Sequence, residues 1–533
     1  MPSLHKRCGG VNMENIDRRR RQLLKGGLGT GALVASGLSF TANASSISGS
    51  TLPLPEYEGW DVTDMASLLR KGEVTPLELF DAATARFEKR KQFNLLSVNH
   101  FERARESASE LSAKSSKERD ALYQQSPLLG VPFALKDLHI QLKDTVTTNG
   151  SVFYKNARAT QNSTLTERYQ AAGLNILAKL TSPEFGQTAT TESQLHGDTL
   201  NPWDTRYSSG GSSGGSAVAV AARILPAAHA SDGGGSIRIP ASHCGVFGLK
   251  PSRGLVPMGP KHMEGWMGLS VHNVITRTVR DTAKLLALTS GQEAGSRIPH
   301  QQHDYLEAVK RPPKRLKIAI MDSHPFGLPI SQDCLDGVNK TAALLTSLGH
   351  HVERAAPILP IESMFSGMGV ATSSGVLHAV RDREASLGRA ATEEEFSPIV
   401  WQHIQRAKTF TAQQVYDARS AFDQGGKAFD QFFNQYDVIL SPVTAGPPPK
   451  IGELSLYQPY DAFVREVIKA SPITALFNMT GLPAMSVPLH WNADNLPIGM
   501  HFAAGFGQEA LLLSLAAQLE TALSWHDRMP STI

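Results

Sequence analysis

The sequence has few of the residues from which disulfide frameworks and metal centres are built. Three cysteines occur among its 533 residues, too few for a disulfide framework. The 18 histidines form no H-E-x-x-H motif, and no Cys-x-x-Cys pair is present. We therefore expect no metal and no other cofactor. His139 is interpreted as a loop or pocket-edge residue, and His243 and the pair His350–His351 as structural residues.

An excess of charge and a long apolar run are also missing. Lys and Arg total 52 and Asp and Glu total 49, which gives a net charge of +3. Residues 1–44 hold seven of the basic and two of the acidic residues, so residues 45–533 carry 45 basic and 47 acidic side chains. This balance gives no indication of a nucleic-acid partner. The apolar stretch 26–40 is too short and too rich in glycine to span a membrane, so we expect no stable membrane anchor.

The first 44 residues resemble an export signal. Arg20 and Arg21 begin the segment R-R-Q-L-L-K, the apolar stretch follows, and Ala42-Asn43-Ala44 offers a cleavage site. We expect residues 1–44 to be a twin-arginine signal peptide that the twin-arginine export machinery recognises and that is removed after Ala44. The protein would then cross the membrane folded and reside in the periplasm.

Three dispersed segments contain the residues that can carry chemistry. Lys136 stands in G-V-P-F-A-L-K-D, Ser212 in G-G-S-S-G-G-S, and Ser236 in S-D-G-G-G-S-I-R-I-P. Serine is a weak nucleophile until a neighbour takes its proton, and a buried neutral lysine can be that neighbour. The consecutive glycines 233–235 can direct several backbone N–H groups into one concavity and form an oxyanion hole. The combination predicts a hydrolase that needs neither histidine nor metal.

Other interpretations of these segments are weaker. Each segment alone is typical of a linker, a turn or a surface pair. Gly210–Gly214 also satisfies G-x-S-x-G, the nucleophile elbow of α/β-hydrolases, but that elbow needs a hydrophobic strand directly upstream. Residues 201–207 are instead polar and contain a proline. The S-x-x-K motif of penicillin-binding proteins occurs only at residues 3–6, inside the export signal.

The order of the three segments and the 24-residue step from Ser212 to Ser236 resemble the amidase signature family. The resemblance implies a Ser–cis-Ser–Lys triad in which Ser236 attacks an amide carbonyl and becomes acylated. Ser212, held by a cis peptide bond with Gly211, would bridge Ser236 to Lys136. Lys136 would have to be neutral to accept the proton, which requires burial.

The resemblance also implies roles for the neighbours of the triad. The oxyanion would be bound by four backbone N–H groups, those of Gly233, Gly234, Gly235 and Ser236. Ser213 would support its loop without bridging, and an ion pair between Asp232 and Arg238 would brace the glycine loop. The family usually has G-T-D before the glycines, whereas this sequence has A-S-D, in which Ser231 keeps the hydroxyl group.

Local patterns predict an α/β fold. The capping box Thr75-Pro76-Leu77-Glu78 marks the start of a helix. We expect strands at residues 174–181, 316–321 and 351–353, and helices at 331–348 and 509–520. Strands that alternate with helices form a sheet covered on both faces. The resemblance implies the amidase-signature fold, one mixed β-sheet covered on both faces by helices.

The resemblance extends over most of residues 45–533, which we expect to be one amidase domain. Its signature core would span about 130–257, and a variable segment at about 355–435 would roof the pocket. The implied activity is hydrolysis of a small-molecule carboxylic amide to a carboxylate and ammonia or an amine. The stretch Phe477–Gly481 is closest to bacterial amidases of hydrophobic or cyclic amides, such as the aminohexanoate-oligomer hydrolases.

Two other functions stay open at this point. The A subunit of a glutamyl-tRNA amidotransferase shares the triad, but the export signal argues against it. A catalytically silent exported binding protein on the same scaffold is the second alternative, and the intact triad argues against that. The sequence leaves the substrate open, and also the choice between a monomer and a homodimer.

Overall fold

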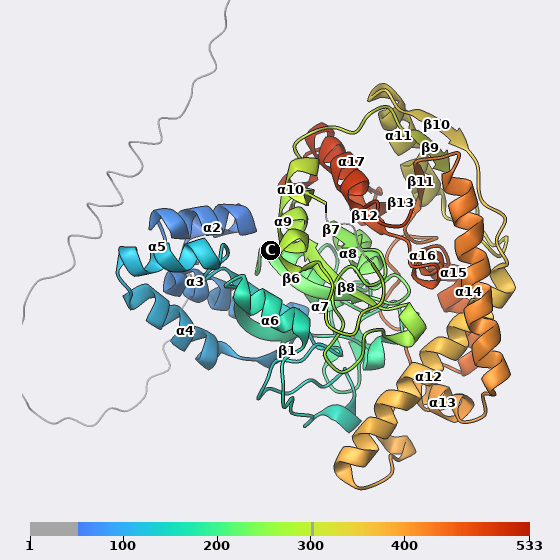
Figure 1. The fold of residues 1–533 in the computed structure, drawn as a ribbon, viewed down its shortest axis with the longest axis horizontal. Helices are drawn as coiled ribbons and strands as arrows, with labels where there is room; N and C mark the ends of the chain where they lie inside the picture. Colours follow the sequence, from blue (N-terminus) through green and yellow to red (C-terminus); the bar gives the residue numbers. More distant parts are fainter. Residues whose placement is uncertain (1–51, 300–302) are drawn as a thin grey trace, which may run out of the picture. The chain divides into compact units, whose positions relative to one another are not determined.

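The computed structural model describes residues 52–299 and 303–533 of the chain (Figure 1). The predicted signal peptide, residues 1–44, lies outside the described residues. Within the described ranges, no helix combines the length and the apolar character that crossing a bilayer requires.

An eight-stranded mixed sheet forms the centre of the structure. Its strand order is β10-β9-β11-β13-β12-β7-β8-β6. The strands are β6 (Ala227–Asp232), β7 (Phe247–Lys250), β8 (Val271–Thr276), β9 (Lys317–Ile320), β10 (His351–Arg354), β11 (Val438–Pro442), β12 (Ala484–Trp491) and β13 (Pro497–Ala504). Strand β9 pairs in parallel with β10 and β11, and all other neighbours pair antiparallel. The predicted mixed sheet is confirmed.

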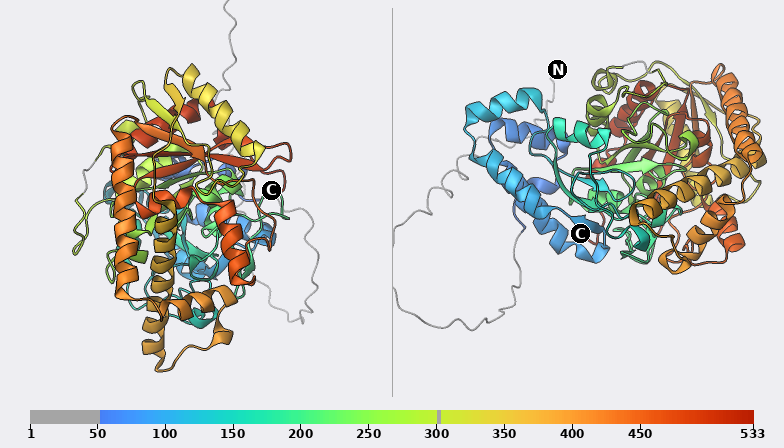
Figure 2. Two further views of the ribbon diagram at one scale, coloured as in Figure 1. Left: turned by 90° about the vertical axis from the view of Figure 1, so that its right-hand side faces the viewer. Right: turned by 60° about the horizontal axis from the view of Figure 1, so that its bottom comes forward.

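Helices from both halves of the described chain lie against the faces of this sheet or to one side of it (Figures 1 and 2). In the first half they are α2 (Val62–Lys71), α3 (Pro76–Lys89), α4 (Phe101–Ala113), α5 (Ser116–Gln125), α6 (Thr164–Ala171), α7 (Gly214–Ala221) and α8 (Arg238–Cys244). In the second half they are α9 (Val279–Thr289), α10 (Tyr305–Ala308), α11 (Gln332–Ser347), α12 (Ile361–Leu387), α13 (Pro398–Ala407), α14 (Ala412–Phe433), α15 (Tyr460–Ala470), α16 (Thr474–Met479) and α17 (Glu509–Ala522).

Both faces of the sheet are covered, as the alternation of side chains along β13 shows. Met500 and Phe502 pack in one hydrophobic core with residues of α9, α11 and α17. His501 and Ala503 point to the opposite face, where His501 contacts α8 and the ring of Phe477 in α16. Helices α12 and α14 pack against each other and against α16 on that side. The sheet therefore separates two layers of helices, as predicted.

A smaller three-stranded sheet, which the sequence did not predict, carries Lys136. Its strands are β1 (Leu96–Asn99), β3 (Asn175–Leu180) and β2 (Pro132–Lys136), in that order. Strand β2 packs against the edge strand β6 of the large sheet. The backbone N–H of Lys136, however, donates to the side-chain Nδ1 of His229 at 3.1 Å. At Lys136, therefore, a side chain and not a strand carbonyl accepts the backbone N–H, and the two sheets are separate.

Most of the local predictions about elements are confirmed. The Thr75 N–H donates to Glu78 at 2.8 Å and the Glu78 N–H donates to Thr75 at 3.2 Å, so the capping box opens α3. The predicted strands correspond to β3, β9 and β10, and the predicted helices to α11 and α17. Helix α7 is made of Gly, Ser, Ala and Val, and every residue in it is buried. Such small side chains let α7 pack closely beneath the serine loop.

Candidate active site

Lys136 ends β2 with a side chain that has no exposed surface. Its Nζ lies 2.7 Å from the Oγ of Ser212 and 3.1 Å from the Oγ of Ser231. Burial lowers the pKa of Lys136 well below its ordinary value, although the charge of Asp232 acts in the opposite direction. A neutral amine has a lone pair that can accept a proton. The structure thus places a proton acceptor beside the first serine that the sequence indicated.

The loop that carries Ser212 is held by contacts on several sides. The peptide bond between Gly211 and Ser212 is cis, as predicted. Gly211 lies so close to the chain at Thr190 that a Cβ atom would collide with the Thr190 carbonyl oxygen. The Ser213 hydroxyl donates to the carbonyl oxygen of Ser231 at 3.2 Å and accepts the Ser231 N–H at 3.4 Å. Ser213 therefore ties the loop to β6.

A buried ion pair organises the glycine loop. Asp232 ends β6, Arg238 begins α8, and neither side chain is exposed. The Nε and Nη2 of Arg238 each donate to one Asp232 carboxylate oxygen at 2.9 Å, so the predicted pair is confirmed and is bidentate. The Ile237 N–H donates to the same carboxylate at 3.1 Å. Burial alone would raise the pKa of Asp232, but the charge and hydrogen bonds of Arg238 lower it below its ordinary value.

One of the predicted oxyanion donors requires correction. The Gly235 N–H donates to the Asp232 carboxylate at 2.7 Å, so it is not available to an oxyanion. Gly235 also adopts a φ of +136°, a conformation that favours glycine. Within the described residues, three N–H groups of the loop have no acceptor and remain available, those of Gly233, Gly234 and Ser236.

Two residues that the sequence did not identify complete the ion-pair network. Asn478 in α16 donates from Nδ2 to Asp232 at 2.8 Å and accepts from Arg238 Nη2 at 2.6 Å. The Nε2 of His501 in β13 lies 3.0 Å from Arg238 Nη1. An asparagine between Phe477 and Met479 indicates a buried polar group that needs partners, and this signal could have identified Asn478. His501, which stands between Met500 and Phe502, carries the same signal.

Two residues of β6 that contact Lys136 were also not assigned to the site. The Ser231 hydroxyl is the second acceptor of the Lys136 amine. The His229 Nδ1 accepts the Lys136 N–H, and its Nε2 lies 2.9 Å from Nδ1 of His272. His229 and Ser231 are two positions apart on one strand and so share a face. That spacing is the signal by which both could have been found.

The two predicted serines line one cavity of about 420 Å³. Ser231 and Gly233 line it too, and His139 stands exposed at its wall, as expected for a pocket-edge residue. In the described part of the chain, no hydrogen bond joins the hydroxyl groups of Ser212 and Ser236. Such catalytic contacts often tighten only when substrate is bound. A second cavity, of about 480 Å³, contains none of the predicted site residues.

We predict that Arg238→Met lowers the free energy of unfolding by about 3 kcal/mol, because it leaves the buried Asp232 carboxylate without its counter-charge. Urea unfolding of both proteins measures the difference. Arg206→Met is the matched control, since it removes an exposed ion pair with Asp204 and should change stability little. Equal stability of Arg238→Met and the unsubstituted protein would show that the network does not hold the loop.

Comparison with known proteins agrees with this geometry. The amidase family profile matches residues 78–513. The chain is 33% identical over 492 residues to the 6-aminohexanoate-cyclic-dimer hydrolase of Paenarthrobacter ureafaciens, covering 89% of this chain and 97% of that protein. The solved structure of a 6-aminohexanoate cyclic dimer hydrolase has a TM-score of 0.81 at 30% identity and covers 89% of this chain and 99% of that one.

A more distant structure shares the fold. A bacterial aryl acylamidase of the amidase signature family has a TM-score of 0.79 at 24% identity, covering 88% of this chain and 98% of that one. The family profile, the relatives that hydrolyse amides and the Lys136–Ser212 contact all lead to one assignment. The chain belongs to the amidase signature family and is an amide hydrolase, an enzyme that cleaves carboxylic C–N bonds.

Proposed function

We propose that Ser236 is the nucleophile that carries the acyl group, and that Ser212 and Lys136 form its proton path. One observation carries this proposal. The amine of the fully buried Lys136 lies 2.7 Å from the Ser212 hydroxyl, and Ser212 lines the cavity that also contains Ser236. A lysine buried against hydroxyl groups gains little stability from its charge. Its use as a base gives a reason for its position.

The reaction takes place in two halves. When Ser236 Oγ attacks the carbonyl carbon, its proton passes to Ser212, and Ser212 gives its own proton to Lys136. The C–N bond then breaks, and the proton returns along the same path to the nitrogen, which leaves as ammonia or an amine. Water attacks the acyl-Ser236 ester and gives a proton to Lys136 through Ser212. The bond from the carbonyl carbon to the Ser236 oxygen then breaks, the proton returns to that oxygen, and the acid leaves as the carboxylate. Both serines and the lysine end in their starting states.

The carbonyl oxygen becomes negatively charged in each attack and needs hydrogen-bond donors. The available N–H groups of Gly233, Gly234 and Ser236 flank the nucleophile, and each such donor lowers the barrier by about 3 kcal/mol. The Asp232–Arg238 pair supports this role, because it takes the Gly235 and Ile237 N–H groups and fixes the loop between them.

The substrate class that we propose is an uncharged secondary amide with an aliphatic acyl chain. Support comes from the 33% identity to a 6-aminohexanoate-cyclic-dimer hydrolase and from apolar side chains in the cavity wall, among them Leu138, Met258 and Trp266. A cavity of about 420 Å³ lies within the usual range for small-molecule sites. No observation favours the amidotransferase subunit or the silent binding protein over this reaction.

The proposed triad predicts large kinetic defects in its three members and a small defect in the neighbouring serine. Ser236→Ala, Ser212→Ala and Lys136→Met should each lower kcat/KM by about 1,000-fold or more, because members of one catalytic unit fail together. Ser213→Ala is the matched control, since it removes a neighbouring buried hydroxyl that bonds a carbonyl, and it should cost about tenfold or less. Steady-state rates with a chromogenic anilide measure all four. A fully active Lys136→Met would contradict the role of Lys136 as the base. A Ser213→Ala variant as impaired as Ser212→Ala would contradict the assignment of Ser212 as the bridging serine.

The pH dependence of the rate tests the state of Lys136. Because burial lowers the pKa of Lys136, the amine becomes neutral and competent at a pH below the ordinary range of lysine. The kcat/KM should therefore rise with pH through that pKa and then level off, when measured between about pH 5 and pH 9. The residual activity of Lys136→Met should lack the rising limb, whereas Ser213→Ala should keep it. If the rate of Lys136→Met still rises with pH, the rise belongs to the titration of another group.

We also propose that residues 1–44 direct export by the twin-arginine route and are removed after Ala44. The support is the pair Arg20–Arg21 and the A-N-A segment at 42–44. N-terminal sequencing of the protein from the periplasm should begin at Ser45. Replacing both arginines by lysine should keep the uncleaved chain in the cytosol. Cytosolic full-length protein that the double substitution leaves unaffected would refute export.

A further inference from the structure

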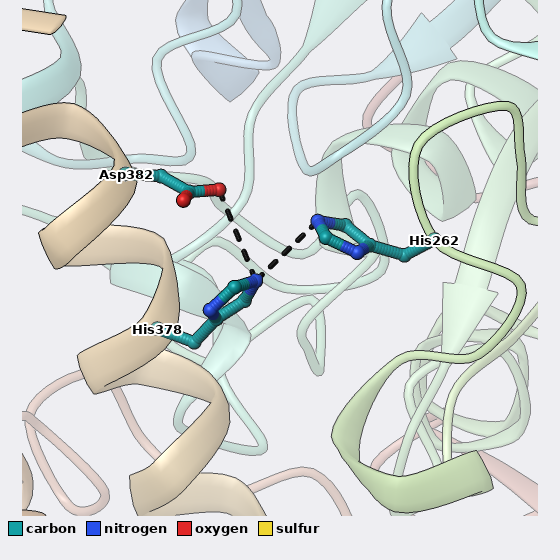
Figure 3. Close-up of side chains that lie close together, drawn as sticks. All are labelled: His262, His378 and Asp382. Atoms are coloured by element: carbon teal, nitrogen blue, oxygen red, sulfur yellow. Dashed lines mark hydrogen bonds and ion pairs between the residues drawn. The ribbon is translucent and has the colours of Figure 1, made fainter. Parts of the chain in front are cut away.

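Three metal-ligating side chains meet at the solvent-exposed part of the active-site cavity (Figure 3). His262 belongs to the loop 251–270 between β7 and β8, and His378 and Asp382 stand one turn apart on α12. The Nε2 of His378 lies 3.4 Å from Nε2 of His262 and 3.8 Å from Oδ2 of Asp382. All three ligand atoms lie within 4.8 Å of one another. This group is separate from the triad, and the reaction does not use it.

These separations are close to those of a metal centre. In a tetrahedral zinc site with bonds of 2.0–2.2 Å, neighbouring ligand atoms lie about 3.3 Å apart. The separations of 3.4 and 3.8 Å need little adjustment, and the third, between His262 and Asp382, is at most 4.8 Å. Residues four apart on a helix project from one face, so His378 and Asp382 form a ready pair that His262 completes. Two imidazoles and one carboxylate leave a fourth position for water.

A cation at this place would have to displace one neighbouring side chain. Lys261 is the competitor, since its Nζ lies 2.5 Å from Asp382 Oδ2. Its side chain is 59% exposed and can move into solvent.

The loop that carries His262 also reaches the glycine loop of the active site. Trp266 of this loop packs directly against the glycine loop: a Cβ atom added to Gly233 would lie 2.7 Å from the Trp266 ring. A Cβ atom on Gly375 of α12 would collide with the other side of the same ring. An ion held by His262 and α12 would therefore fix the loop against the helix, at the place where the cavity opens.

We propose that His262, His378 and Asp382 bind one divalent transition-metal ion, for which Zn²⁺ is the probe, and that the bound ion inhibits the enzyme by restricting substrate access. The binding site stands on its own geometry, whereas the inhibition rests on the proposed function. If no ion binds there, the His262–His378 contact is a hydrogen bond between two side chains, and Lys261–Asp382 is an ordinary surface ion pair.

Calorimetric titration of the EDTA-dialysed full chain with zinc sulfate tests the site. We expect one equivalent of Zn²⁺ to bind, and His262→Ala and His378→Ala each to weaken the affinity by about tenfold or more. Lys261→Met should tighten binding severalfold, because it removes the competing cation. His351→Ala is the matched control, since this exposed histidine pairs with Glu353 on β10 and should not change the affinity. Circular dichroism and urea unfolding establish that each variant is folded.

Rates measured in parallel separate the two parts of the proposal. Zn²⁺ should lower the kcat/KM of the unsubstituted protein about tenfold at saturation, and EDTA should restore it. The kcat/KM of His378→Ala should not change when Zn²⁺ is added. EDTA without added Zn²⁺ should leave the rate of the unsubstituted protein unchanged. Absence of zinc binding, or equal binding by His378→Ala and the unsubstituted protein, would overturn the site. Binding without any change in rate would overturn the inhibition. A protein that binds Zn²⁺ but hydrolyses no amide would refute the proposed function and leave the site standing.

Discussion

A lysine amine that ends inside a protein must be neutral or must lie beside an opposite charge, because burying an uncompensated charge is costly. Lys136 meets this constraint with two hydroxyl partners, Ser212 and Ser231, while the nearby carboxylate of Asp232 is engaged by Arg238. The amine is therefore held in the form that accepts protons. Strand β2 positions the Lys136 amine, strand β6 supplies Ser231, and the loop before α7 brings Ser212 next to the amine. The chemistry of the site follows from where one side chain is buried.

The second requirement is a rigid glycine loop, and a buried network meets it. Glycines lose much conformational freedom on folding, so a run of three needs external support. Asp232 and Arg238 supply that support together with Asn478, which comes from an element about 240 residues further along the chain. The large sheet and α16 are thus part of the site, because they hold the partners of Arg238. We therefore expect stability and catalysis to depend on the same carboxylate.

Local signals predicted much of this arrangement. The capping box at Thr75, the strands and helices of the α/β pattern and the Asp232–Arg238 ion pair follow from short segments, whereas the Lys136–Ser212 pair was implied by the resemblance to the amidase signature family. Long-range partners such as His501 could not be predicted, because nothing near them in the sequence indicates what they touch. The direction of the Gly235 N–H was also beyond the sequence, because it depends on the backbone angles of the preceding glycines, which have few conformational limits.

The position of a covalent adduct is the most direct measurement of the central claim, that Ser236 carries the acyl group. The protein is treated with a fluorophosphonate, digested, and its peptides are mapped by mass spectrometry. A single adduct on Ser236, which forms far more slowly in Lys136→Met, is the predicted result. An adduct on Ser212, or none on either serine in an active preparation, would contradict the assignment of the nucleophile and of the proton path behind it.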